Sequence, residues 1–234
     1  MSQSPSPAPD LPNVRTPSLL GRAVGGFGAS ILGGAAIGAG AWLSDQLDYP
    51  LSLVLPANTI GVWVGAAFAL GASARTIPTG ALRGLIGLLS AVAAYYLLIA
   101  VFGVGVRVIG ASHAASIWGF VALVAGPAMG GAGAVWRHGH GWPRAFAVAF
   151  LAATLIAEGV AFGGGRLVAF AELAADPGAL LLVAEIVLGA ALPWLLLAPG
   201  ERARGYLATM ALAVVAAVAI GPVTGVIREL ADRF

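Results

Sequence analysis

Long apolar stretches recur along almost the whole chain, and polar residues are confined to the short gaps between them. An α-helix rises about 1.5 Å per residue, so roughly 20 apolar residues cross the hydrocarbon core of a bilayer. The pattern predicts an all-α, polytopic membrane helix bundle of about seven transmembrane helices. The predicted spans are Leu19–Leu43, Thr59–Ala74, Thr79–Phe102, His113–Val135, Pro143–Phe162, Gly178–Ala198 and Gly205–Ile227.

The two ends of this pattern differ in character. Residues 1–18 are rich in Ser and Pro and show no apolar periodicity, which predicts a disordered cytoplasmic tail. Residues 19–234 are predicted to form a single transmembrane helical domain. The second span would rise only roughly 24 Å, so we expect it to borrow from residues 51–58, where Pro56 would bend or interrupt a helix. A re-entrant segment at residues 51–58 is the alternative.

Composition supports a membrane protein over a soluble one. Hydrophobic residues make up 59% of the 234 residues and charged residues only 9%, against about 25% charged residues in soluble domains. The net charge is +2, and the arginines are spread one or two per gap, so no basic face for nucleic acid is expected. The chain contains no Cys, which excludes disulfides and thiolate metal sites, and no Lys, which excludes a retinal Schiff base.

Arginine placement predicts the orientation, because the cytoplasmic ends of helices carry the excess of positive charge. The span ends that alternate with the amino terminus hold Arg15, Arg22, Arg75, Arg83, Arg137, Arg144, Arg202 and Arg204. The opposite ends hold Arg107, Arg166, Arg228 and Arg233. This asymmetry predicts a cytoplasmic amino terminus and an outer carboxyl terminus, in the inner or plasma membrane. Arg22 and Arg83, one turn inside their spans, are expected to extend toward the headgroups.

Small residues are placed to hold the helices together. Lipid tails are as apolar as Leu, so helices associate through close packing and hydrogen bonds. Gly-x-x-x-Gly spacings occur at Gly21/Gly25, Gly34/Gly38, Gly61/Gly65, Gly80/Gly84, Gly126/Gly130, Gly159/Gly163 and Gly221/Gly225. Their spread favours a compact bundle over a single dimer face. The string Gly-Pro-x-x-Gly occurs at residues 126–130 and 221–225, which fits either an inverted repeat of three helices or chance in a Gly-rich chain.

Two carboxyl groups lie inside apolar spans, where ionisable groups are costly and are by default functional candidates. Glu158 lies in the fifth span and Glu185 in the sixth, and both fall roughly 4 to 8 Å to the outer side of the midplane. Thr154, Ala161 and Gly165 share a face with Glu158, so this face is expected to point into the bundle. The alternative is that both glutamates only form hydrogen bonds between helices.

Aromatic residues are predicted at a comparable depth. Trp63, Tyr95, Tyr96 and Trp118 lie in the outer halves of their spans, and Asn58 lies just above them. Together with Glu158 and Glu185 they are the candidate substrate-binding residues of an outward-facing pocket for a small cationic or aromatic ligand. The alternative is an interfacial aromatic belt.

No motif for catalysis is found. The sequence has no Walker motif, no His-Glu-x-x-His and no nucleophile with a matching base, so we expect neither an enzyme nor a cofactor. His138 and His140 form a His-x-His pair, but two ligands make a poor metal site, and a solvated turn is expected there instead.

Several short strings carry a family resemblance. They are Ala57-Asn58 followed by Trp63, Phe68 and Gly71, then Tyr95-Tyr96, then Gly126-Pro127 with Gly130 leading to Trp136-Arg137, and finally Glu158-Gly159. In these strings the chain resembles an uncharacterised family of bacterial multi-pass integral membrane proteins that carries only a domain-of-unknown-function label. The resemblance implies a membrane helix fold and no activity. In size and span number alone the chain also resembles the substrate-binding subunits of energy-coupled vitamin importers, which usually have six spans.

The sequence thus predicts an integral membrane protein in contact with the lipid bilayer. Its predicted function is transport or binding of a small solute through an outer-facing pocket around Glu158 and Glu185. The alternative is a membrane scaffold or assembly partner without catalytic or transport activity. A cavity open to the outer leaflet and lined by Tyr95, Glu158 and Glu185 would favour the first function, and a dry, filled bundle would favour the second.

Overall fold

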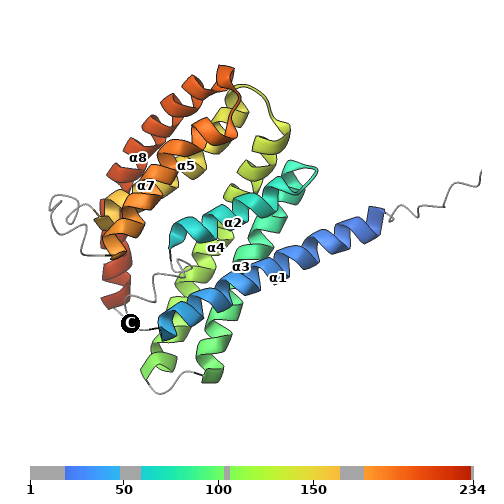
Figure 1. Ribbon diagram of the computed structural model, residues 1–234. Helices are drawn as coiled ribbons and strands as arrows, with labels where there is room; N and C mark the ends of the chain where they lie inside the picture. Colours follow the sequence, from blue (N-terminus) through green and yellow to red (C-terminus); the bar gives the residue numbers. More distant parts are fainter. Residues whose placement is uncertain (1–18, 48–58, 103–105, 164–176, 233–234) are drawn as a thin grey trace, which may run out of the picture.

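The computed structural model of the chain is a bundle of helices (Figure 1). It describes the backbone of residues 19–47, 59–102, 106–163 and 177–232, and the side chains of residues 26–47, 59–102, 114–161 and 180–216. These residues form seven helices and no strand, which confirms the predicted all-α class. The helices are α1 (Leu19–Gln46), α2 (Ile60–Ala72), α3 (Ile77–Phe102), α4 (Val106–His138), α5 (Trp142–Gly163), α7 (Pro177–Leu196) and α8 (Pro199–Asp232).

Each predicted span coincides with one of these helices, and the differences lie at the ends. α4 begins at Val106 instead of His113, and α8 begins at Pro199 instead of Gly205. Pro199 suits the first position of a helix, and Glu201 suits the positive end of the helix dipole, so polar residues extend α8 beyond its apolar part. The predicted tail at residues 1–18 and the segment at residues 51–58 lie outside the described residues.

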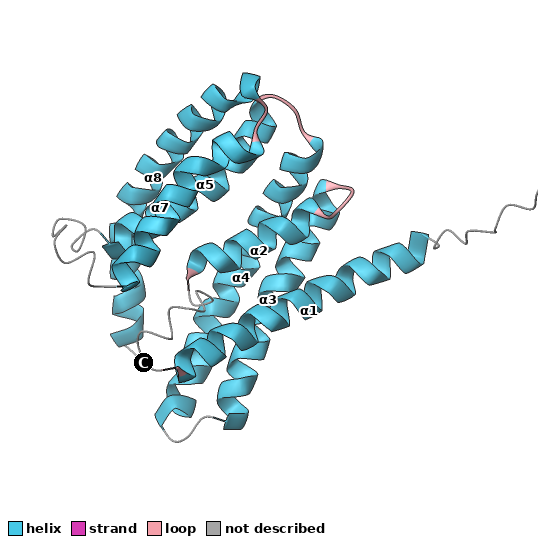
Figure 2. Ribbon diagram, viewed as in Figure 1, coloured by secondary structure: helices cyan, strands magenta, loops and turns pink. Residues whose placement is uncertain are grey.

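The helices form two groups with α2 between them (Figure 2). α1 packs on α3, which packs on α4, and α5 packs on both α7 and α8. α2 contacts α3, α4 and α5. The turns that join α2 to α3, α4 to α5 and α7 to α8 lie at the same end of the bundle, which we call the inner end (Figure 1). The opposite end is called the outer end.

The sides of the bundle that face away from its core are apolar, as expected for helices in lipid. Among the residues whose side chains are described, four helical segments are long and apolar enough to cross a membrane, namely Gly26–Gln46, Ile77–Phe102, Ala114–His138 and Trp142–Ala161. Ile60–Ala72 and Leu180–Leu196 are shorter apolar helices. Leu32, Phe120 and Met210 are each more than two-thirds exposed, which would be costly in water. The chain is therefore an integral membrane protein whose exposed helix faces contact the bilayer.

Glycines allow the helices of the first group to approach closely. A Cβ atom on Gly34 of α1 would collide with the carbonyl oxygen of Gly87 in α3. A Cβ atom on Gly84 of α3 would likewise collide with the carbonyl oxygen of Gly126 in α4. These contacts place small residues between the backbones of neighbouring helices, which is the packing that the Gly-x-x-x-Gly spacings predict.

The inner end is held by contacts between its turns. The backbone N–H of Gly141, in the left-handed region at φ 62°, donates to Glu201 Oε1 at 2.6 Å. Arg144 Nη1 lies 3.8 Å from Glu201 Oε2, the other oxygen of this carboxylate. Trp136 Nε1 donates to the carbonyl oxygen of Leu196 at 3.0 Å. These contacts tie the turn between α4 and α5 to the turn between α7 and α8.

Two predictions about the inner end can be compared with the structure. Arg83 does extend toward this end, but its Nη1 donates to the backbone oxygen and the hydroxyl of Ser73 at 3.0 and 2.9 Å. It therefore binds the turn between α2 and α3. In the predicted solvated turn, His140 is exposed, whereas His138 Nε2 lies 2.8 Å from the carbonyl oxygen of Ala74 and links α4 to α2.

The inverted repeat, one of the two interpretations of the Gly-Pro strings, gains no support from the packing. It would pair α2, α3 and α4 with α5, α7 and α8. α3 and α4 form the most extensive interface of the bundle, whereas α7 and α8 contact each other little. The first Gly-Pro string lies in α4, where Pro127 is inside the helix. The side chains of the second string lie outside the described residues.

Candidate functional site

α2 is too short to cross the bilayer by itself, so its first turn would lie at membrane depth when its other end reaches the membrane interface. Its 13 residues rise about 20 Å, against a hydrocarbon core of about 30 Å. Thr59 caps this turn, because its hydroxyl oxygen accepts from the backbone N–H of Val62 at 3.4 Å. The N–H groups of the first turn would otherwise have no helical partner. An exposed helix start would be unstable inside hydrocarbon, so other partners are needed.

Glu158 of α5 supplies these partners from outside the helix. Its Oε1 accepts from the backbone N–H of Ile60 at 2.7 Å, and its Oε2 accepts from the N–H of Gly61 at 2.6 Å. The side chain is 7% exposed. A carboxylate at this place also interacts with the positive end of the helix dipole, which stabilises it by up to about 2 kcal/mol in a partly buried site. Glu158 therefore binds α5 to the start of α2.

Glu185 of α7 lies beside this contact. The Oε1 atom of Glu185 and the Oε2 atom of Glu158 lie 3.0 and 3.5 Å from the position that a Cβ on Gly61 would occupy. Glu185 is 6% exposed, and its Oε2 has no hydrogen-bond partner among the described residues. The two carboxyl groups thus share one buried place next to the first turn of α2, and we call them the carboxyl pair.

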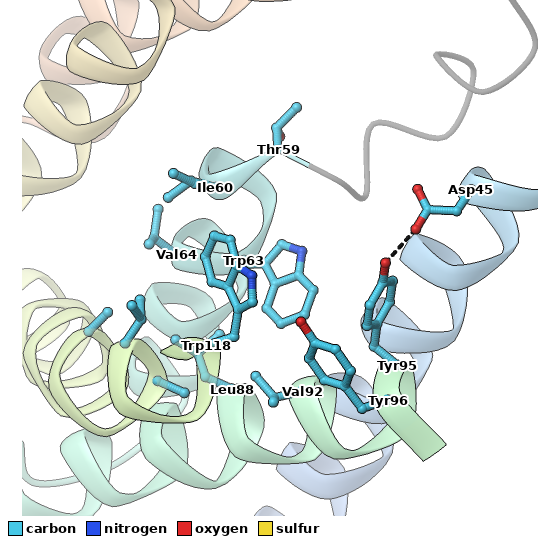
Figure 3. A pocket seen from close by; sticks show the side chains of 13 residues that line it. Asp45, Thr59, Ile60, Trp63, Val64, Leu88, Val92, Tyr95, Tyr96 and Trp118 are labelled. Carbon is cyan, nitrogen blue, oxygen red and sulfur yellow. Dashed lines mark hydrogen bonds between the residues drawn. The ribbon is translucent and has the colours of Figure 1, made fainter. Parts of the chain in front are cut away.

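A cavity of about 200 Å³ lies on another side of the same turn (Figure 3). It is formed by residues of α1, α2, α3 and α4. Its polar groups and aromatic rings come from Asp45, Thr59, Trp63, Tyr95, Tyr96 and Trp118. The rest of its lining is aliphatic and includes Ile60, Val64, Leu88 and Val92. We call this space the aromatic cavity.

The aromatic side chains of the cavity are oriented by contacts of their own. Tyr95 OH donates to Asp45 Oδ2, which joins α3 to the last turn of α1 (Figure 3). The rings of Tyr95 and Tyr96 meet edge to face, with centroids 4.9 Å apart and planes at 82°. Trp118 of α4 is 42% exposed. Four aromatic side chains and one carboxylate thus line the same space.

The structure separates the predicted site residues into two sets. Trp63, Tyr95, Tyr96 and Trp118 all line the aromatic cavity. Glu158 and Glu185 do not line it, because they lie against the backbone of α2, whose first turn also contributes to the cavity wall. Asn58 lies outside the described residues.

Two residues of this region were missed by the sequence analysis. Asp45 falls after the predicted end of the first span at Leu43, whereas α1 continues to Gln46. The feature that could have identified it is an acidic residue two positions after an apolar run. Thr59 was predicted as the first residue of a span. The feature that could have identified its role is its residue type, which often caps a helix, directly before an apolar helix.

Comparisons with known proteins identify a family for this chain but no activity. No curated protein and no solved structure matches the chain. The likeness to subunits of vitamin importers therefore has no further support. A family model described as a family of unknown function, DUF6518, matches residues 17–228, which confirms the resemblance to an uncharacterised family. This match covers most of the polypeptide, and the chain therefore belongs to the DUF6518 family.

Proposed function

We propose that this membrane protein binds a small organic cation in the aromatic cavity, as a step of its transport across the membrane. The observation that supports this proposal is the set of four aromatic residues and one carboxylate around a single cavity. Ring faces attract cations, and the attraction grows when water is excluded. The volume of about 200 Å³ is below the range of roughly 300 to 1,000 Å³ for drug-sized ligands, so the solute should be small.

Asp45 supplies the charge that would select a cation over a neutral molecule. It lies in the last turn of α1, is exposed, and accepts from Tyr95 OH. A carboxylate accepts more than one hydrogen bond, so Asp45 can hold the hydroxyl of Tyr95 and also face an ammonium group. We also propose that the protein is not an enzyme, since the residues described around the cavity offer no activated nucleophile.

Binding can be tested with three molecules of one shape and different charge. The purified protein in lipid nanodiscs is titrated calorimetrically with 2-phenylethylammonium, 2-phenylethanol and phenylacetate. We expect the ammonium compound to bind most tightly and the anion most weakly. Asp45→Asn should weaken binding of the ammonium compound by about tenfold, which corresponds to about 1.4 kcal/mol, and should leave binding of the alcohol nearly unchanged.

Two variants complete this experiment. Trp63→Leu should weaken binding of both the ammonium compound and the alcohol, since it removes a ring from the cavity. Glu201→Gln, at the inner end, should change neither affinity and serves as the control. Equal affinity for all three molecules, or an Asp45→Asn variant that binds like the wild type, would contradict the proposed cation site. Uptake of the labelled ammonium compound into proteoliposomes then tests transport.

A membrane scaffold is the second candidate function, and one observation favours it. Both carboxylate oxygens of Glu158 accept hydrogen bonds from the backbone of α2, as expected for a residue that only joins helices. A folded protein that binds none of the three molecules would support the scaffold.

A further inference from the structure

The carboxyl pair sits in a place where two negative charges are hard to sustain. Glu158 and Glu185 are more than nine-tenths buried, and both approach Gly61. The first turn of α2 supplies a partial positive charge of only about half an elementary charge. Burial of a second, uncompensated carboxylate would cost several kcal/mol. The pair therefore needs one bound positive charge.

The hydrogen bonds favour Glu158 as the ionised member of the pair. Both oxygens of Glu158 accept from backbone N–H groups, at 2.7 and 2.6 Å. A proton on either oxygen would point toward a donor, so Glu158 is the carboxylate. Glu185 instead has a buried Oε2 atom without a partner among the described residues. A protonated carboxyl group is neutral and is less costly to bury than an ion.

We propose that the carboxyl pair is a proton-binding site, in which Glu185 carries one exchangeable proton and ionised Glu158 caps α2. A metal cation is the less suitable ligand. Hard cations take about six or more oxygen ligands, and the described residues at the pair supply only the remaining carboxyl oxygens and the hydroxyl of Thr59. The unpartnered, buried Oε2 of Glu185 is the atom that would hold the proton.

The site would be linked to the aromatic cavity through one turn of helix. Ile60 donates its N–H to Glu158 and also lines the cavity with its side chain. Thr59, the capping residue directly before it, and Trp63, about one turn further along α2, line the cavity as well. A change of charge at the pair would alter the hydrogen bonds that hold this turn, and thereby the cavity wall. This linkage rests on the proposed function, whereas the proton site does not.

Other ionisable groups of the neighbouring helices lie elsewhere. On α1 and α3, Asp45, Tyr95 and Tyr96 lie at the aromatic cavity, on another side of the first turn of α2. The remaining described ionisable side chains of α3, α4, α5 and α8 lie at the inner end, and they are Arg83, Arg137, His138, Arg144, Glu201, Arg202, Arg204 and Tyr206. Within the described residues, the pair thus faces no other ionisable side chain.

Infrared spectroscopy can detect the proton directly and without a solute. The full protein in lipid nanodiscs should show, at pH 7, the carbonyl stretch of a protonated carboxylic acid, with a shift in D2O. We expect this band to vanish in Glu185→Gln, because the remaining carboxyl group, Glu158, is the ionised member of the pair. Glu201→Gln should keep the band, because that carboxyl group lies at the inner end. Helical circular dichroism and size-exclusion elution verify that each variant is folded.

Three results would overturn the proton site. They are a wild-type spectrum without the band, a band that survives in folded Glu185→Gln, and a band that is lost when NaCl replaces KCl at constant pH. The last result would assign the pair to a metal cation. If Glu185→Gln does not fold, Glu185→Asp replaces it, and it should retain the band at a changed frequency. A Glu185→Asp spectrum identical to the wild type would also contradict the assignment.

The linkage is tested separately with 2-phenylethylammonium. Its affinity should change with pH by up to about tenfold per pH unit, the limit for one linked proton, and binding of the cation should in turn change proton affinity. Glu185→Gln should remove most of this dependence. An infrared band together with pH-independent affinity would refute only the linkage. An infrared band without any binding would refute the proposed function and leave the proton site intact.

Discussion

Glu158 illustrates how a single buried residue can be structural and chemical at once. Its two hydrogen bonds satisfy N–H groups of a helix start that lies at membrane depth, and removal of a partner from buried N–H groups costs about 1 to 3 kcal/mol each. The same carboxylate imposes a condition on Glu185, since both cannot be charged at little cost. Stability and proton binding are therefore coupled at this residue.

Gly61 is the residue that allows the carboxyl pair to approach α2. A Cβ there would lie 2.5 Å from Leu155 Cδ2 and 3.0 Å from Glu185 Oε1. We expect Gly61→Ala to destabilise the protein by about 1 to 3 kcal/mol, because it forces α2 away from α5 and α7. Thermal unfolding of the detergent-solubilised protein measures this loss.

Gly65 provides the matched control in the same helix. Nothing lies within 4 Å of a Cβ at Gly65, and Ala is favoured over Gly in a helix by about 1 kcal/mol. Gly65→Ala should therefore leave stability unchanged or raise it. Equal unfolding temperatures for the two variants would show that the first turn of α2 is not tightly packed against the pair.

At the scale of elements, the short α2 organises the candidate site. It contacts helices of both groups, and its first turn contacts the carboxyl pair with its backbone and the aromatic cavity with its side chains. α1 contributes Asp45 to the cavity only because it packs closely on α3. The position of each functional group thus depends on contacts between helices.

The contact of α1 with α3 can be tested at Gly34. A Cβ at this position would collide with the carbonyl oxygen of Gly87, a backbone atom that cannot move without the helix. Gly34→Ala should lower stability by about 1 to 3 kcal/mol and should also weaken binding of 2-phenylethylammonium, because α1 carries Asp45. Gly28→Ala, in the same helix with open space around it, should do neither. A Gly34→Ala variant with the stability and affinity of the wild type would rule out this packing.

At the scale of the whole molecule, arginine side chains are concentrated at the inner end. Arg75, Arg137, Arg144, Arg202 and Arg204 all lie in or beside the three inner turns. Arg202 and Arg204 stack over the exposed rings of Trp194 and Trp142, with distances of 5.2 and 5.7 Å to the ring centroids. Trp and Arg side chains of this kind suit a membrane interface, and the positive-inside rule predicts that this interface is cytoplasmic.

The orientation can be measured with single cysteines, because the chain has none of its own. In intact cells, an impermeant maleimide should label Gln46→Cys at the outer end and should not label His140→Cys at the inner end. Both residues are exposed in the structure. Permeabilised cells should give labelling of both variants, which verifies that each cysteine is reactive. The opposite pattern in intact cells would reverse the predicted topology.

The sequence by itself determined that this protein is surrounded by lipid and where most of its helices begin and end. Apolar runs of sufficient length can be stable in lipid only as helices, since every backbone polar group must be paired within the segment. The helices α3, α5 and α7 therefore begin and end within two residues of their predicted bounds. The aromatic residues that line the cavity were also predicted. The rise of a helix per residue gives the depth of each side chain in its span, and these side chains lie at a similar depth.

Only the tertiary structure decided which side chains meet. The depth of Glu158 in its span was predictable, but its partners, Ile60 and Gly61, are 98 and 97 residues away in the chain. No local pattern records such a contact, because it arises from how α5 packs on α2. The same reason explains why the carboxyl pair and the aromatic cavity, expected as one layer, are separated by the first turn of a short helix.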